Sequence, residues 1–174
     1  MKPASIRRLW KLEEREVQAL AEVLMDCVEG DASVSFMHPL SVVAADEFWR
    51  KIAFDVEKGE RALLVAEDEH GICGTVQLVL GQPENQPHRA DLAKMLVHRR
   101  ARRQGVGAAL VRSAELVARY CGKNLLVLDT VTGRDGARLY ERMGWVRVGD
   151  IPGYALMPRG GLCSTTIYFR TLGD

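Results

Sequence analysis

The stretch spanning residues 89–120 constrains the fold most, because it joins a strand to a helix through a basic turn with two glycines. The strand-like run ends at Val97, and the turn that follows reads HRRARRQGVG. Apolar residues then recur at helical spacing, at Leu110, Val111, Ala114, Val117 and Ala118. Glycines let a backbone approach a ligand closely, and the first free N–H groups of a helix bind anions. The stretch therefore predicts a site for a phosphorylated cofactor.

Two common nucleotide-binding motifs do not fit this turn. The dinucleotide fingerprint is incomplete because the residue three positions after Gly107 is Leu110, and no Gly-Lys-Ser or Gly-Lys-Thr follows for a P-loop. The remaining pattern is Arg102-x-x-Gly105-x-Gly107 after a strand that ends in Met-Leu-Val. This pattern resembles the pyrophosphate-arm motif of the GNAT superfamily of acyl-CoA N-acyltransferases.

A second motif lies downstream, in the segment ARLYERMGW at residues 137–145. It resembles the A-x-x-L-Y-x-x-x-G-F/W signature of the same superfamily, with Tyr140 as the signature tyrosine. One position departs from the family pattern: Arg134 stands where the family usually has asparagine. We expect Arg134 to replace a neutral contact to the cofactor with a charged one, or the contact to be lost.

The order of expected elements is also that of the GNAT fold. We expect a mixed α/β sheet, mostly antiparallel and splayed, with one parallel crossover and flanking helices, in a single domain over residues 1–174. The expected strands are 5–10, 61–67, 72–80, 89–97, 125–128, 145–149 and 165–170. The expected helices are 12–28, 41–58, 103–120 and 134–143, and residues 151–162 are expected to form a loop rich in Gly and Pro.

Several shorter sequence segments resemble one particular group within this superfamily. They lie at residues 32–37, 65–68, 128–130, 152–154 and 167–172. These blocks look like those of the tabtoxin-resistance group of acetyltransferases, which acetylate a small, amino-acid-like β-lactam toxin. The resemblance implies a toxin- or antibiotic-resistance role.

Composition excludes other classes of protein. The 174 residues fit one domain, and a net charge near +1 predicts neither nucleic acid nor membrane as partner. The four cysteines are far apart, which argues against a disulfide framework or a zinc site and favours a reducing cytoplasm. No two histidines share metal-ligand spacing with an acid or a cysteine, so we expect no metal. We also expect no cleaved leader and no membrane-spanning segment.

The family resemblance implies how acetyl-CoA is held. The pyrophosphate is expected to bind the backbone N–H groups of the turn, with charge from two of its arginines; the residues are Arg102, Arg103, Gln104, Gly105, Val106 and Gly107. Arg99 and Arg100 either contact the 3′-phosphate or face water. The pantetheine arm is expected between the strands at 89–97 and 125–128, paired with the backbone of Met95 and Val97, and a backbone N–H near Met95 or Leu96 is expected to polarise the thioester.

Three side chains are candidates for the chemistry. Asp91 and Asp129 lie on the two splayed strands, where a carboxylate could attract a cationic amine and accept its proton. The alternatives are a surface strand residue for Asp91 and a turn-starting cap for Asp129. Tyr140 could give a proton to the leaving thiolate, and the alternative is a helix tyrosine that packs on the core.

The acceptor site is expected at Tyr154 and at Phe36. The apolar segment around Phe36 is either a buried plug or a wall of that site. The sequence thus predicts an acetyl-CoA-dependent N-acetyltransferase of a small amine. The alternatives are a protein or peptide N-acetyltransferase and a non-catalytic acyl-CoA-binding module. Strand edges near the C-terminus would allow a homodimer.

Overall fold

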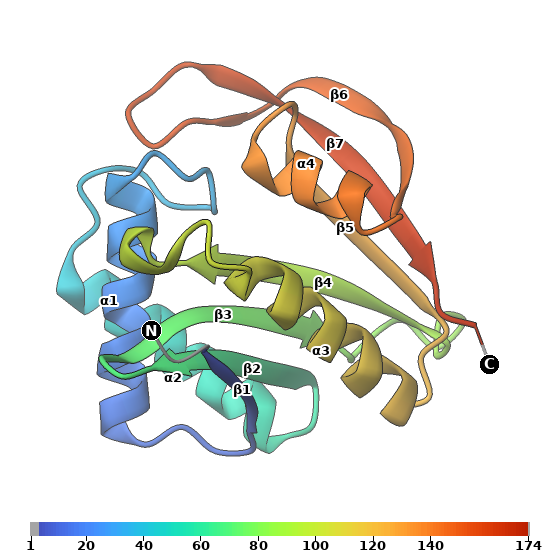
Figure 1. The fold of residues 1–174 in the computed structure, drawn as a ribbon, viewed down its shortest axis with the longest axis horizontal. Coiled ribbons are helices and arrows are strands. Elements are labelled where there is room, and N and C mark those ends of the chain that lie inside the picture. The colour runs from blue at the N-terminus through green and yellow to red at the C-terminus, as the bar shows by residue number, and fades with distance from the viewer. Residues whose placement is uncertain (1–3, 174) are drawn as a thin grey trace.

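A computed structural model describes residues 4–173 as one seven-stranded sheet with helices on both faces (Figure 1). The strands are β1 (Ser5–Leu9), β2 (Arg61–Asp68), β3 (Gly71–Val79), β4 (Arg89–Val97), β5 (Leu125–Val131), β6 (Val146–Leu156) and β7 (Leu162–Thr171). The helices are α1 (Glu14–Glu29), α2 (Val42–Glu57), α3 (Val106–Tyr120), α4 (Asp135–Arg142) and the 3₁₀ turn η1 (Arg99–Ala101). No helix among the described residues has the length and apolar character needed to cross a membrane.

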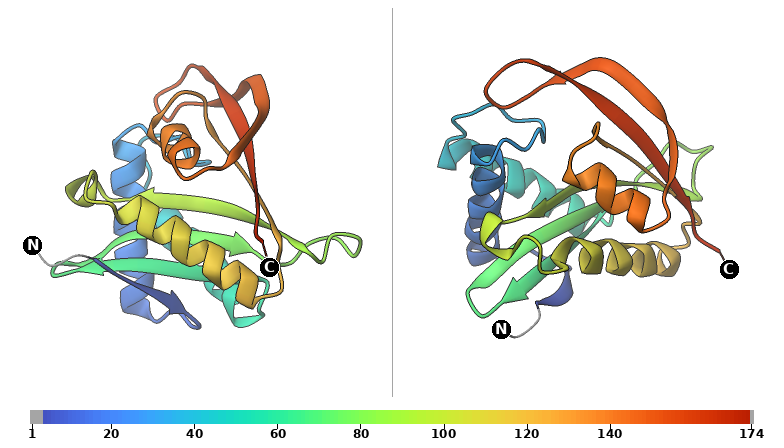
Figure 2. Two further views of the ribbon diagram at one scale, coloured as in Figure 1. Left: turned by 45° about the vertical axis from the view of Figure 1, so that its right-hand side comes forward. Right: turned by 45° about the horizontal axis from the view of Figure 1, so that its top comes forward.

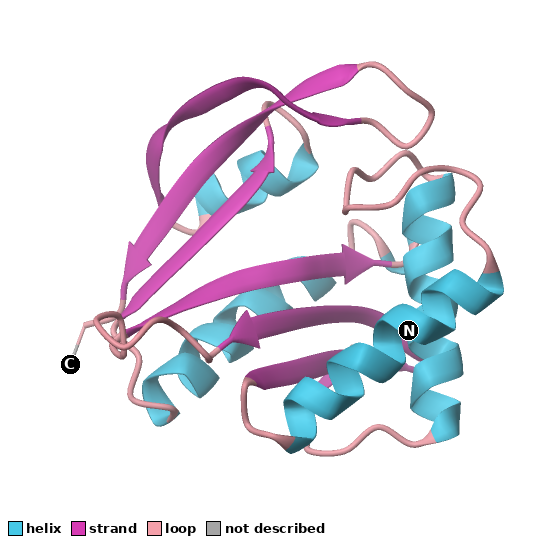
Figure 3. Ribbon diagram, turned by 180° about the vertical axis from the view of Figure 1, so that it is seen from behind, coloured by secondary structure: helices cyan, strands magenta, loops and turns pink. Residues whose placement is uncertain are grey.

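The sheet is divided at its parallel pair of strands. Its order is β1-β2-β3-β4-β5-β7-β6, and every neighbouring pair is antiparallel except β4 and β5. These two strands pair only where Arg89–Asp91 lie against Leu125–Val127. Beyond this short ladder they diverge, as Figure 3 shows from behind. The predicted mixed, splayed α/β fold is therefore confirmed.

Two hydrophobic cores hold the layers together. Helices α1 and α2 bury one apolar side each, including Leu24 and Trp49, against one face of β2–β4. Helix α3 covers the other face with Leu110 and Val111, and α4 adds Tyr140 to the same cluster (Figure 2). Because cores on both faces fix β4, the position of the strand beside the opening is set by packing from two sides.

The helix boundaries follow from local chemistry. The Ser41 hydroxyl accepts the N–H of Ala44 at 3.1 Å, as the predicted N-cap of α2 requires. Helix α3 begins at Val106, three residues later than expected, because Arg103 and Gly105 both adopt left-handed backbone conformations with φ of 61° and 79°. The basic turn is therefore a separate structure that precedes the helix.

The prediction of a loop at residues 151–162 is wrong for the first half of that segment. Strand β6 continues to Leu156, and only residues 157–161 form the turn into β7. A register shift between Ile151 and Ala155 accommodates Pro152, which cannot donate to the ladder, and Gly153, whose φ is 61°. Strand β5 also runs three residues further than expected, to Val131, so Asp129 lies within a strand.

A bulge in β4 changes the face that its residues present. The register with β3 shifts between Thr75 and Gln77, where Lys94 adopts a φ of 50°. Before the bulge Leu92 belongs to the core under α3, whereas Leu96, four residues later, belongs to the core under α1. A regular strand would place both on one face. The bulge thus reorients the residues next to the divergence of β4 and β5.

Candidate active site

The diverging strands enclose a cavity of about 460 Å³. Its walls come from the α1–α2 loop, β4, β5, α4 and the β6–β7 hairpin, and they include Phe36, Lys94, Met95, Asp129, Tyr140 and Tyr154. Five of these six are residues that the sequence singled out, the exception being Lys94. Residues from distant parts of the chain are thus brought to one site.

The turn before α3 presents a row of free backbone donors. Among residues 4–173, none accepts a hydrogen bond from the backbone N–H groups of residues 103–108, and the first bond of this region runs from Ala109 to the Gly105 carbonyl at 3.0 Å. Three of these donors are the first N–H groups of α3. A row of unpaired N–H groups at a helix start is the arrangement that binds phosphate oxygens.

The two glycines of this turn serve different purposes. Gly105 has a φ of 79°, which a residue with a Cβ adopts only with strain, and it has open space around it. A Cβ on Gly107 would lie 3.2 Å from Leu139 and 3.8 Å from the Met95 side chain. Gly107 therefore allows the start of α3 to pack closely against α4 and β4.

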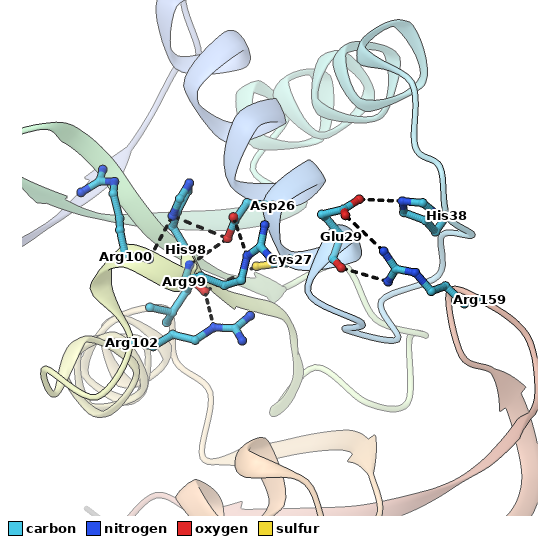
Figure 4. Close-up of polar contacts among 10 residues, drawn as sticks. Asp26, Cys27, Glu29, His38, His98, Arg99, Arg100, Arg102 and Arg159 are labelled. Carbon is cyan, nitrogen blue, oxygen red and sulfur yellow. Dashed lines mark hydrogen bonds and ion pairs between the residues drawn. The ribbon is translucent and has the colours of Figure 1, made fainter.

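Three arginines of the turn, Arg99, Arg100 and Arg102, contact neighbouring elements (Figure 4). The backbone N–H and guanidinium of Arg99 both donate to Asp26 at 2.8 Å, and Arg100 forms an ion pair with Asp68. Arg102 donates from Nε to the Val97 carbonyl at 3.1 Å. Neither Arg99 nor Arg100 simply faces water, because each anchors the turn to the rest of the fold.

The carboxylate of Asp26 is ionised well below neutral pH. Burial by itself would raise the pKa of Asp26, but the two hydrogen bonds from Arg99 and the charge of His98 outweigh burial and lower it. A charged acceptor therefore ties the start of η1 to the last turns of α1.

Beyond Asp91 the inner edge of β4 has no strand of residues 4–173 paired with it. The N–H of His98 donates to the Cys73 carbonyl at 2.9 Å, so alternate residues from His98 back to Leu96 face β3. The polar groups of Val97 accordingly face away from β3, whereas Met95 lies in the bulge. The Val97 carbonyl accepts from the Cys27 thiol at 3.5 Å and from Arg102.

Asp129 and Tyr140 lie together in the cavity wall. The carboxylate of Asp129 accepts the Thr165 hydroxyl at 2.7 Å, which orients it. Tyr140 is 4% exposed and packs against Trp145, with ring centroids 5.4 Å apart. Burial, and secondarily the charge of Asp129, raises the pKa of Tyr140, so the phenol keeps its proton at neutral pH.

Asp91 lies apart from this pair. It is in the short ladder where β4 and β5 still pair, opposite Val127, and it does not line the cavity. Its carboxylate forms an ion pair with Arg89 and accepts the Gln82 amide at 3.2 Å. The structure therefore brings Asp129 but not Asp91 to the site.

Lys94 is a cavity residue that sequence reasoning missed. Its ammonium donates to the Ser35 hydroxyl at 2.9 Å and lies 6.0 Å from the ring centroid of Phe48. Phe48 in turn packs edge-on against Phe36, with centroids 5.2 Å apart. The segment around Phe36 is thus a wall of the cavity, one of the two alternatives that the sequence left open.

Contacts between distant segments close one side of the cavity. The α1–α2 loop reaches the β6–β7 hairpin through Ser33, which donates to the Leu156 carbonyl at 3.0 Å, and through the His38 N–H, which donates to the Pro158 carbonyl at 2.8 Å. Arg159, in the hairpin turn, pairs with Glu29 at 3.2 Å. The hairpin is therefore fastened over the cavity, with Tyr154 54% exposed at its edge.

Arg134 is paired with a carboxylate at the start of α4. It is the N-cap of α4, and its guanidinium lies 3.7 Å from the Asp31 carboxylate. Both groups are substantially exposed, so this pair is a weak link across the opening. A contact from Arg134 to the cofactor stays a prediction.

The residues present fit acetyl-CoA. The free N–H groups before α3 suit a pyrophosphate, and the unpaired edge of β4 suits an extended amide-containing arm. For a metal, by contrast, no group of three or more His, Cys, Asp or Glu side chains is assembled within residues 4–173.

Comparisons with known proteins agree with this geometry. The model of the acetyltransferase (GNAT) domain family matches residues 59–147. Human N-acetyltransferase 8 is 37% identical over 88 residues, which cover 49% of this chain and 39% of that protein. The chain thus spans about two fifths of the length of this curated relative.

Solved structures match nearly the whole chain. The yncA protein of Salmonella typhimurium, determined with its cofactor acetyl-CoA, has a TM-score of 0.79 and 16% identity over 99% of this chain and 96% of its own. The ribosomal-protein-alanine N-acetyltransferase of Brucella melitensis has a TM-score of 0.78 and 20% identity over 97% and 99% of the two chains. At these identities the likeness concerns the fold.

The family match includes the strands that splay, the turn with its free N–H groups, and Tyr140. It covers just over half of the 174 residues. The chain therefore belongs to the GNAT family of acetyltransferases.

Proposed function

We propose that this protein transfers the acetyl group of acetyl-CoA to the amine of a small molecule. The observation that carries the proposal is the cavity between the diverging strands, which holds a carboxylate and a protonated phenol beside a row of free backbone donors. Acetyl-CoA supplies an activated acetyl group, and its transfer forms an N–C bond while the C–S bond of the thioester breaks.

The cofactor would be held by backbone groups. The N–H groups of residues 103–108 would bind the pyrophosphate, with Arg102 and Arg103 adding positive charge. Met95 and Val97 would pair with the arm through their backbone, and the N–H of Met95, rather than that of Leu96, would donate to the thioester oxygen, because Leu96 faces β3.

Two side chains would manage the protons. The Asp129 carboxylate, oriented by Thr165, would attract the ammonium of the acceptor and take its proton, directly or through a water molecule. The Tyr140 phenol would donate its proton to the sulfur of the leaving thiolate. Asp91 takes no part in this scheme because Arg89 and Gln82 engage its carboxylate outside the cavity.

A small acceptor is favoured by the contacts that cross the cavity. The hairpin is fastened to the end of α1 through Glu29 and to the α1–α2 loop through Ser33, which shortens any groove that could receive an extended peptide. The likeness of residues 152–154 and 167–172 to the tabtoxin-resistance group also supports a small toxin or antibiotic as acceptor. A peptide acceptor is the second candidate, since the fold is shared with an enzyme named for a ribosomal-protein alanine.

The cellular setting belongs to the same proposal. All four cysteines are free thiols, in keeping with a reducing cytoplasm.

The exposed edge of β6, with Val148 62% exposed, would allow a homodimer.

Thiol release tests the function directly. Purified protein is mixed with acetyl-CoA and a panel of amines, amino acids, antibiotics and peptides, and free CoA is measured with a thiol reagent. We expect release with small amines and little with peptides. Release with peptides alone would favour the second candidate, and acetyl-CoA binding without release from any acceptor would favour a non-catalytic binding module.

A further inference from the structure

The cavity contains a cation that the acetyl-transfer chemistry does not use. Lys94 is half-buried in the wall, and its side chain lies on the α2 side of β4, near the Phe48 ring. Met95 packs on the opposite side, 3.8 Å from the Cβ position of Gly107 at the start of α3. Lys94 therefore faces away from the turn that would bind the pyrophosphate.

The ammonium of Lys94 makes fewer hydrogen bonds than it has N–H donors. An ammonium has three N–H donors, yet within residues 4–173 the Ser35 hydroxyl is its one hydrogen-bond partner and no carboxylate forms an ion pair with it. Burial, and then the charge of Arg61, lowers the pKa of Lys94, while the charge of Asp129 opposes this. A half-buried cation without a counter-ion has lost part of its hydration, and an anionic ligand would compensate for that loss.

The backbone around this contact is strained on both sides. Lys94 and Ser35 have φ of 50° and 79°, and they are two of four non-glycine residues with positive φ among those described. Strain of this kind costs about 1–3 kcal/mol per residue and gathers at ligand sites. Here the two strained residues come from separate elements and are hydrogen-bonded to each other in the cavity wall.

A second free donor lies on the same face of the sheet. Gln77 pairs with Ala93 across β3 and β4, so the two side chains share a face, and Ala93 lines the cavity. Gln77 is fully buried; its oxygen accepts from Arg61 at 2.9 Å, but its amide nitrogen has no partner. Two groups on this face, the Gln77 amide and the Lys94 ammonium, therefore have N–H donors to spare, whereas Arg61 is paired with Asp55 at 2.9 Å.

The cavity wall opposite Lys94 carries a negative charge, that of the Asp129 carboxylate. Asp129 and Tyr140 lie on β5 and α4, across the cavity from the β4 wall that carries Lys94. We infer that Lys94, with Ser35, binds a carboxylate of the acceptor, so that the acceptor is a small molecule carrying both an amine and a carboxylate. The amine then lies toward Asp129 and the carboxylate toward Lys94.

This inference rests on the proposed function and adds a specificity-determining residue to it. It predicts that the enzyme discriminates between an amino acid and its amide. The common amino acids and short ω-amino acids are therefore compared with their primary amides as acceptors, by thiol release. Rates are normalised to the unprotonated fraction of each amine, so that the comparison reports on the carboxylate.

The expected result is a preference of about 10- to 100-fold in kcat/KM for the free acid, the factor that one charge-assisted hydrogen bond provides. Lys94→Met should abolish the preference by raising KM for the acid, and it should leave the amide and the affinity for acetyl-CoA unchanged. Lys51→Met, which removes an exposed lysine of α2, should behave as the wild type. Unchanged acetyl-CoA affinity also shows that the variant is folded.

Two results overturn the inference while leaving the acetyltransferase proposal intact. One is equal use of acid and amide by the wild type. The other is an equal loss with both acceptors in Lys94→Met, which would mark a structural role. Absence of thiol release from every acceptor would instead reject the proposed function itself.

Discussion

At the scale of single residues, the cavity wall brings together a candidate proton donor, Tyr140, and a candidate proton acceptor, Asp129. Tyr140 is buried and protonated, whereas Asp129 is held by one hydroxyl and is open to the cavity. The two lie close enough for the charge of Asp129 to influence the pKa of Tyr140. Acyl transfer from a thioester to an ammonium needs one group to accept a proton and another to donate one.

Tyr140→Phe should reduce kcat by about 100-fold or more, because the leaving thiolate loses its proton donor. The affinity for acetyl-CoA should stay the same, since the ring still packs against Trp145. Steady-state kinetics with titration of acetyl-CoA binding would measure both. Tyr120→Phe, at a site 85% exposed on α3, is the matched control. Wild-type turnover in Tyr140→Phe would remove the phenol from the mechanism.

Asp129→Asn should lower kcat/KM for the acceptor by about 100-fold, because the amide can still accept from Thr165 but cannot take up a proton. Asp91→Asn is the informative comparison. It should retain turnover, since its side chain pairs with Arg89 and Gln82 outside the cavity. The two variants are compared by thiol release at one pH, and the reverse order of effects would exchange the roles of the carboxylates.

At the scale of elements, the turn between β4 and α3 is a preformed anion site that depends on its glycine. Gly105→Ala should place a Cβ at a φ of 79°, at a cost of about 1–2 kcal/mol. The turn would then adopt its binding conformation less often, and acetyl-CoA should bind about 5- to 30-fold more weakly.

Calorimetric titration of acetyl-CoA would measure this change. Gly149→Ala is the control, because Gly149 has neither a positive φ nor an atom within 4 Å of its Cβ position. An unchanged dissociation constant in Gly105→Ala would show that the turn does not form the pyrophosphate site.

The link between α1 and η1 should make a pH-dependent contribution to stability. Because the folded-state pKa of Asp26 is lowered, its contribution is fully present above its ordinary pKa and is lost as the pH falls through the lowered value. Asp26→Asn should therefore reduce the free energy of unfolding by about 1–2 kcal/mol at neutral pH. The difference from the wild type should shrink in acid, once the pH lies below the ordinary aspartate pKa of about 3.9.

Urea unfolding at the two pH values would test this dependence. Glu22→Gln, on the same helix, is the control, and it should change stability little because Glu22 forms no ion pair among the described residues. A constant difference between Asp26→Asn and the wild type at both pH values would contradict an electrostatic origin.

The order of elements and the cofactor turn were predictable because they depend on local chemistry. Periodic apolar residues identify α3, and Gly105 identifies the turn. The role of Lys94 was not predictable, because simple alternation places it on the face of Leu92, and only the bulge turns it to the other side. The continuation of β6 past Pro152 was missed for a similar reason, since a register shift is a property of the paired strands.

At the scale of the whole molecule, the sheet consists of two parts joined by a narrow ladder. Only Arg89–Asp91 and Leu125–Val127 connect β1–β4 to β5–β7 within the sheet. A ligand that lies between β4 and β5 would contact both parts. Acetyl-CoA at about 100 times its dissociation constant should therefore stabilise the protein by about 2.7 kcal/mol.

Urea or thermal unfolding with and without acetyl-CoA measures this stabilisation, and amide hydrogen exchange locates it. Protection should appear in the backbone of residues 103–108, whose N–H groups have no partner among residues 4–173 in the free protein. Adenosine alone should give little protection of β4. Stabilisation without protection there would place the cofactor elsewhere.

The last turns of α1 contact both the turn before α3 and, through Arg159, the β6–β7 hairpin (Figure 4). Asp26 fastens the cofactor turn through Arg99, and Glu29, three residues later, fastens the β6–β7 hairpin through Arg159 and His38. A displacement of the last turn of α1 would therefore move both the proposed cofactor site and the hairpin at the acceptor site. The two binding equilibria should be thermodynamically coupled, and reciprocity requires acetyl-CoA to change the affinity for the acceptor by the same factor as the acceptor changes the affinity for acetyl-CoA.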